Sequence, residues 1–136
     1  MVAVNVVAQV FAGLAAFVHV LVFVWEALLF RRPSVHRGIF RVPGEDVPAV
    51  LLWSFGVGFY NLFLASGTVL GLVLLNTGDE AVGRALVFYT CGFMALSGVV
   101  LFAADRMALG RPRGAGLSGV AGQLGPPLVV FATAFL

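Results

Sequence analysis

The sequence predicts an all-α protein, a four-helix transmembrane bundle with up-down-up-down topology and both termini outside the membrane. The first observation behind this prediction is composition. Hydrophobic residues make up 61% of the 136 residues and charged residues 10%, whereas soluble domains are about 45–50% apolar and about 25% charged. The second is that four long stretches carry no charged side chain, and the third is that the arginines gather in two of the intervening loops.

The same composition excludes several classes of protein. With a mean hydropathy of +1.07, the chain has too few charged residues to cover a soluble enzyme or to keep a tail disordered. Its basic residues are eight arginines and the net charge is only +2, too little for a nucleic-acid partner. The single cysteine, Cys91, excludes an intrachain disulfide or a CxxC motif. We predict no metal or cofactor, because the sequence has only two histidines and no nucleotide-binding glycine motif.

The charge-free stretches set the predicted helices. A bilayer core of about 30 Å requires about 20 apolar residues in a helix, and only helices or closed barrels satisfy their backbone polar groups in lipid. Strict apolar–polar alternation is absent, so we predict helices rather than barrel strands. They cover residues 3–30, 48–75, 84–105 and 117–135 of a single integral membrane domain, 1–136. The first stretch lacks the basic beginning of a signal peptide and carries His19 and Glu26, so we interpret it as a permanent span.

The loop arginines set the orientation. Seven arginines lie after the first and third predicted helices, whereas the loop between the second and third holds Asp79 and Glu80 with Arg84. By the positive-inside rule, the two arginine-rich loops are predicted to face the cytoplasm. Trp25 and Trp53 fall near the cytoplasmic ends of their helices, where aromatic residues are enriched. A specific anionic-lipid site is an alternative role for the arginines.

The first predicted helix carries a polar stripe. Its members recur at steps of four and three residues and share one helical face; they are Asn5, Gln9, Ala12, Ala16, His19, Phe23 and Glu26. This stripe is predicted to face the bundle interior, because lipid offers no hydrogen bonds. His19 and Glu26 are about 10 Å apart along a straight helix, so they require a connecting group. Ionisable groups within a span indicate a functional site; the alternative is that Glu26 pairs with a loop arginine and His19 bonds a neighbouring helix.

Polar residues of the second and fourth helices fall at similar depths. At 1.5 Å per residue, Asn61 lies about 20 Å and His19 about 18 Å from the cytoplasmic side. Gln123 lies about 10 Å deep, close to Glu26. We predict that these four side chains form one polar pocket, provided that their helix faces converge. Gln123 has an alternative role in satisfying carbonyl groups freed by the Pro126–Pro127 pair.

A glycine pair in the second helix favours close helix contact. Gly67 and Gly71 form a GxxxG motif, which lets two helix backbones approach. Packing within the bundle is the simpler interpretation. A homo-oligomer that uses the same motif is the alternative.

These residues together resemble a family of small bacterial four-helix membrane proteins, domain of unknown function 1304. The resemblance covers nearly the whole chain and rests on motifs in all four predicted helices: His19-x6-Glu26 with Phe30 and Pro33, Gly58-Phe59-Tyr60-Asn61, Leu64-Ala65-x-Gly67, Cys91 with Gly98, and Gln123-x-x-Pro126-Pro127. Gly56-Val57-Gly58 departs from the Asn-Gln-Gly usual in the family, so two polar groups are missing here. The resemblance implies a four-helix membrane bundle, a bacterial inner-membrane location and no particular reaction.

The favoured functional hypothesis is a site within the membrane for a small lipophilic molecule, in a protein whose other partner is membrane lipid. His19 and Glu26 are the candidate catalytic acid–base groups, suited to isomerisation or cyclisation of an isoprenoid-like substrate. The candidate ligand-binding residues are polar or aromatic: Tyr60, Asn61, Gln123, Trp25 and Trp53. The alternatives are a proton-coupled transporter or conductor, in which His19 and Glu26 belong to a relay, and an accessory subunit whose polar residues serve only helix contacts.

Overall fold

The structure, a computed structural model, describes residues 4–134 and 136, and every regular element in this part of the chain is helical. The four long helices are α1 (Val6–Phe23), α3 (Val47–Thr77), α4 (Glu80–Arg106) and α5 (Leu117–Thr133). The π-helical turn η1 (Val24–Leu28) extends α1, and the short helices α2 (Pro33–His36) and η2 (Gly44–Asp46) lie between η1 and α3. The predicted all-α class is therefore confirmed.

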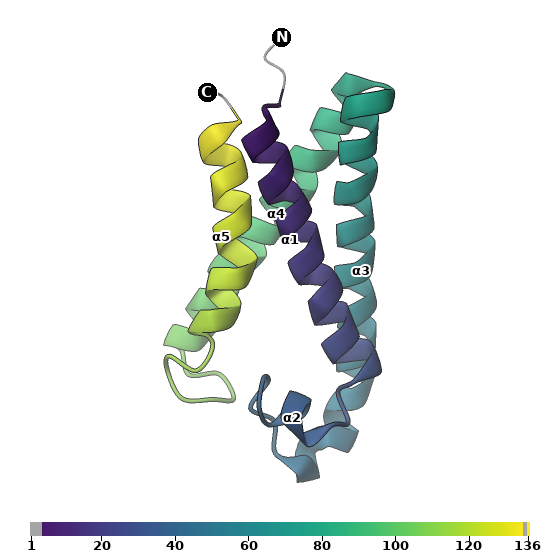
Figure 1. The fold of residues 1–136 in the computed structure, drawn as a ribbon. Coiled ribbons are helices and arrows are strands. Elements are labelled where there is room, and N and C mark those ends of the chain that lie inside the picture. The colour runs from purple at the N-terminus through teal and green to yellow at the C-terminus, as the bar shows by residue number, and fades with distance from the viewer. Residues whose placement is uncertain (1–3, 135) are drawn as a thin grey trace.

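The long helices pack beside their neighbours along the chain. α1 contacts α3 and α5, and α4 contacts the same two helices from behind α1. Figure 1 shows α4 beginning beside α3 and crossing to finish beside α5, so that the pair α1–α3 diverges from the pair α4–α5 toward one end. The two arginine-rich segments, residues 29–46 and 107–116, lie at that diverging end, hereafter the arginine end.

Three helical segments are long and apolar enough to cross a membrane. They are Val6–Leu28, Gly44–Thr77 and Glu80–Arg106. The fourth, α5, is an apolar helix of 17 residues, which corresponds to about 25 Å. It begins directly after the loop glycines Gly114 and Gly116, as the sequence predicts.

The helices pack most closely at the end opposite the arginines. A buried core there combines residues in and just before α1 with side chains of α4 and of the end of α5 and the residue after it: Val4, Ala8, Ala12, Val87, Cys91, Val130 and Ala134. Glycines allow this approach, because a Cβ on Gly71 would lie 2.9 Å from Val87 Cγ2 and one on Gly83 would lie 2.5 Å from the Leu75 nitrogen. The GxxxG motif thus packs within the chain, with Gly67 beside Thr90.

Candidate functional site

The last turn of the first long helix widens around Glu26. Residues Val24–Leu28 form a π-helical turn, and the Leu29 N–H donates to the Val24 carbonyl at 3.0 Å, five residues back. Such turns are rare and interrupt the regular α-helical bonding pattern. The Ser54 hydroxyl on α3 donates to the Glu26 carbonyl oxygen and so ties this widened turn to the neighbouring helix.

Asn61 of α3 holds the Glu26 side chain. The Asn61 Nδ2 donates to Glu26 Oε2 at 3.0 Å and to the carbonyl of Val57 at 3.0 Å. Both amide hydrogens are therefore engaged, one in its own helix and one across to η1. The bond fixes one carboxyl oxygen of Glu26 against α3, and the other oxygen makes no hydrogen bond with a residue in the described part of the chain.

A glycine lets α3 approach the π turn. A Cβ on Gly58 would lie 2.9 Å from both the nitrogen and the Cβ of Ala27, and 3.2 Å from the Cβ of Glu26. Gly58 lies between Ser54 and Asn61, one helical turn from each. The three residues form one face of α3 that receives η1, so the position of Glu26 is set by hydrogen bonds on both sides of a close backbone contact.

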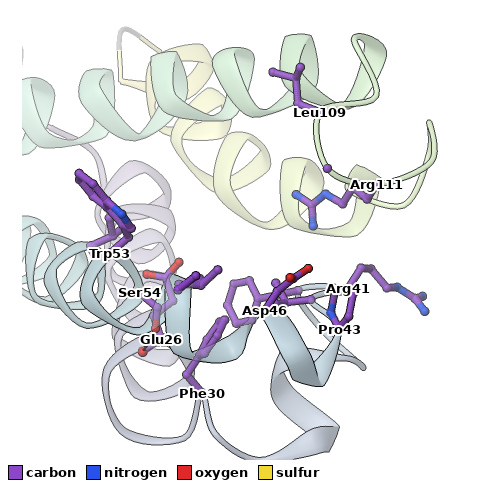
Figure 2. A pocket seen from close by; sticks show the side chains of 15 residues that line it. Glu26, Phe30, Arg41, Pro43, Asp46, Trp53, Ser54, Leu109 and Arg111 are labelled. Atoms are coloured by element: carbon purple, nitrogen blue, oxygen red, sulfur yellow. Dashed lines mark hydrogen bonds between the residues drawn. The ribbon is translucent and has the colours of Figure 1, made fainter.

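A cavity of about 560 Å³ opens at the arginine end beside Glu26. It lies between η1, the segment leading into α3, the first turns of α3 and the loop after α4 (Figure 2). Most of its lining is apolar or aromatic: Phe30, Phe40, Val42, Pro43, Ala49, Val50, Trp53, Val57 and Leu109. The remaining lining residues are Glu26, Ser54, Arg41, Asp46, Gly110 and Arg111. We call this space the loop-end cavity.

The segment between η1 and α3 folds into a small hydrophobic wall of the cavity. The rings of Phe30 and Phe40 pack with their centroids 5.5 Å apart. The ring of buried His36 lies tilted beside that of Phe30, and its Nδ1 donates to the Val42 carbonyl at 2.8 Å. His36 therefore organises this wall rather than presenting its ring to the cavity.

The opposite wall is organised by Asp105 at the end of α4. Its carboxylate accepts backbone N–H bonds from Gly114 at 2.8 Å and Gly116 at 2.8 Å, and it forms an ion pair with Arg106. These bonds fold the loop of residues 107–116 back against the start of α5. Arg111, in this loop, thereby reaches the loop-end cavity.

The structure separates the predicted site residues. Glu26 and Trp53 line the loop-end cavity, and Asn61 bonds to Glu26. His19 is 1% exposed inside the bundle, where its Nδ1 donates to the Ala15 carbonyl at 2.9 Å. No hydrogen bond among the described residues joins His19 to Glu26 or Asn61.

The other predicted ligand-binding side chains also lie apart from the cavity. Tyr60 is 72% exposed on the outer surface of α3. Trp25 and Gln123 are half-buried and do not line the loop-end cavity. Gln123 makes no side-chain hydrogen bond within the described residues, including to the carbonyls near Pro126 and Pro127.

Several cavity residues carry no strong sequence signal. Ser54 is an ordinary helical serine by sequence, and only its contact with the π turn distinguishes it. Phe40 and Arg111 lie in loops whose folding depends on His36 and Asp105. Within the described residues, no group of three or more His, Cys, Asp or Glu side chains is placed to hold a metal ion.

The chain is similar to a known protein family. A family model described as "Protein of unknown function (DUF1304)" matches residues 13–135. The chain belongs to this family. The match spans the DUF1304 chain from the middle of α1 to the end of α5 and includes Glu26, Asn61 and every residue of the loop-end cavity. No curated protein and no solved structure matches the chain.

Proposed function

We propose that this DUF1304 protein is a bacterial inner-membrane protein that binds a small lipophilic molecule in the loop-end cavity. In this proposal α1, α3, α4 and α5 are the four spans of a bundle, the termini face outward and the arginine end faces the cytoplasm. The apolar character of the helices and the gathering of both arginine-rich segments at one end support this arrangement.

The observation that carries the proposal is a carboxyl group in the wall of a largely apolar cavity. Sites for small molecules are typically about 300–1,000 Å³, apolar in most of their lining and supplied with a few fixed polar groups. The loop-end cavity has this size and lining. Glu26 is its fixed polar group, because Asn61 holds its side chain and Ser54 holds its backbone.

Acid–base chemistry on the bound molecule is an extension of this proposal and rests on Glu26 alone. A carboxyl beside an apolar chain can exchange a proton with it, as isomerisation or cyclisation of an isoprenoid-like substrate requires. The placement of His19 inside the bundle, bonded to Ala15, supports a packing role for this residue in place of a catalytic one.

Photoaffinity labelling of the purified full-length protein tests the binding proposal. The probe is a long-chain alcohol that carries a diazirine in its tail, and labelled peptides are mapped by mass spectrometry. We expect labels around Phe30, Phe40 and Trp53, lost on competition with the unlabelled alcohol. Val57→Phe narrows the cavity and should lower labelling several-fold. Val73→Phe, at a comparably exposed position of α3 outside the cavity, is the matched control. Equal labelling of both variants contradicts the proposal.

A further inference from the structure

We infer that the molecule bound in the loop-end cavity is a phosphate monoester of a lipid-like chain, with its phosphate at Arg111 and its apolar chain passing Glu26. This inference rests on the proposed function and names the chemical class of the ligand.

Arg111 presents to the cavity a guanidinium that has no ion-pair partner in the described part of the chain. Figure 2 shows its guanidinium turned toward the opposite wall, whereas the side chain of Arg41 extends away from the other lining side chains. Arg111 is half-buried, and the ion pair within the described residues is that of Arg106 with Asp105. A partly buried guanidinium without an acidic partner is suited to bind an oxyanion through two parallel hydrogen bonds.

The loop fold holds Arg111 in this position. A Cβ on Gly116 would lie 3.3 Å from Arg111 Nη2 and 3.1 Å from Asp105 Oδ1, so the guanidinium packs against the backbone at the start of α5. Asp105 is already occupied by the N–H groups of Gly114 and Gly116 and by Arg106. The chain therefore positions the Arg111 cation and leaves its face toward the cavity open.

The cation of Arg111 favours a head group of high negative charge, and the carboxylate of Asp46 opposes it. Asp46 faces Arg111 from the opposite wall without forming an ion pair, and Glu26 lies at the far end of the lining (Figure 2). A phosphate monoester carries about −1.5 to −2 at neutral pH and three acceptor oxygens. The Arg111 guanidinium therefore attracts it more strongly than it attracts a ligand carboxylate with a single charge.

The apolar lining selects a lipid-like chain over free phosphate. The lining that Arg111 shares with Glu26 includes Phe30, Val50 and Val57, whose side chains offer no hydrogen bond to an inorganic ion. A hydrocarbon chain buries this surface and brings its carbons past the Glu26 carboxyl. Such a chain enters from the lipid leaflet that borders the arginine end.

The test compares two diazirine probes with the same chain, one ending in the alcohol and the other in its phosphate monoester. In the full-length protein we expect half-maximal labelling of the cavity at a concentration at least tenfold lower for the phosphate. Arg111→Gln should remove this preference. Arg113→Gln, two residues along the same loop and outside the cavity, should retain it. Asp46→Asn should strengthen phosphate labelling, because it removes a negative charge that faces the head group.

The outcomes separate this inference from the function on which it rests. Cavity labelling by the alcohol with no preference for the phosphate, or an equal preference in Arg111→Gln and Arg113→Gln, overturns the head-group assignment and leaves the lipophilic site standing. A carboxylate of the same chain that matches the phosphate overturns it as well. Displacement of the phosphate probe by excess inorganic phosphate assigns the site to the free ion and overturns the lipid class. Absence of cavity labelling by every probe contradicts both proposals.

Discussion

The Asn61 amide lies 3.0 Å from Glu26 Oε2 and joins the middle of α3 to the π-helical turn that extends α1. It is a side-chain hydrogen bond between two helical segments that are long and apolar enough to cross a membrane. The bond aligns the carboxyl with the wall of the loop-end cavity. Both the stability of this helix pair and the binding site therefore depend on the same contact.

A double-mutant cycle with Glu26→Ala and Asn61→Ala measures this contact. Side-chain hydrogen bonds between membrane helices contribute about 0.6 kcal/mol on average and about 1.7 kcal/mol at most, so we expect a coupling energy in this range. The free energy of unfolding in mixed detergent micelles is the measured quantity. A matched cycle with Tyr60→Ala in place of Asn61→Ala should give additive effects, because Tyr60 faces outward. Additive effects for Asn61 would show that the contact does not form.

Alanine substitutions at Gly58 and Gly56 test the close contact between α3 and η1. Gly58→Ala places a Cβ 2.9 Å from the Ala27 backbone, so α3 must move away from η1, and overpacking of this kind costs about 1–3 kcal/mol. Gly56→Ala meets no atom within 4 Å and should be neutral or stabilising by up to about 1 kcal/mol, because alanine favours the helix. Unfolding measurements on both variants check this difference, and labelling with the alcohol probe should fall in Gly58→Ala alone. Equal stability of the two variants would contradict the close contact at Gly58.

The positions of the charged residues in the sequence were sufficient to predict where the long helices lie. The predicted spans 48–75 and 84–105 correspond to α3 at Val47–Thr77 and α4 at Glu80–Arg106. α4 begins before the predicted residue 84 because Asp79 caps it by accepting hydrogen bonds from the N–H groups of Ala81 and Val82. The predicted span 117–135 begins where α5 begins.

The candidate site could be predicted only in part. The depth of a residue along its helix does not specify which residue of the neighbouring helix it contacts. Counting residues from the cytoplasmic side placed Asn61 at the depth of His19, whereas the Asn61 side chain donates a hydrogen bond to Glu26. The physical reason is that α3 begins well below the level of Glu26: Ser54, two turns into α3, is the residue that reaches the Glu26 carbonyl. The π-helical turn also changes the direction in which the side chains after Phe23 point. No residue pattern in this sequence predicts such a turn.

Asp105→Asn tests how the arginine end is organised. The substitution removes the charge that accepts N–H bonds from Gly114 and Gly116, and a lost charged hydrogen bond costs about 1.5–3 kcal/mol. We expect hydrogen exchange of these two amides to accelerate at least tenfold. Asp79→Asn is the control, because Asp79 makes the same kind of backbone bonds at the other end of α4. Unchanged exchange at Gly114 in Asp105→Asn would refute the proposed support of the loop and of Arg111.

Cysteine labelling tests the topology from a Cys91→Ala background. Native Cys91 is fully buried, so a maleimide should not react with it until the protein unfolds. Ser34→Cys and Ser118→Cys place exposed thiols at the arginine end, and Thr77→Cys places one at the opposite end. The positive-inside rule predicts that the arginine-rich loops face the cytoplasm. An impermeant maleimide should therefore label Thr77→Cys on intact spheroplasts and the other two only after permeabilisation. The reverse labelling pattern would show that the orientation is opposite to the one proposed. If Ser34→Cys and Ser118→Cys were labelled from different sides, the two arginine-rich loops could not lie at the same membrane surface.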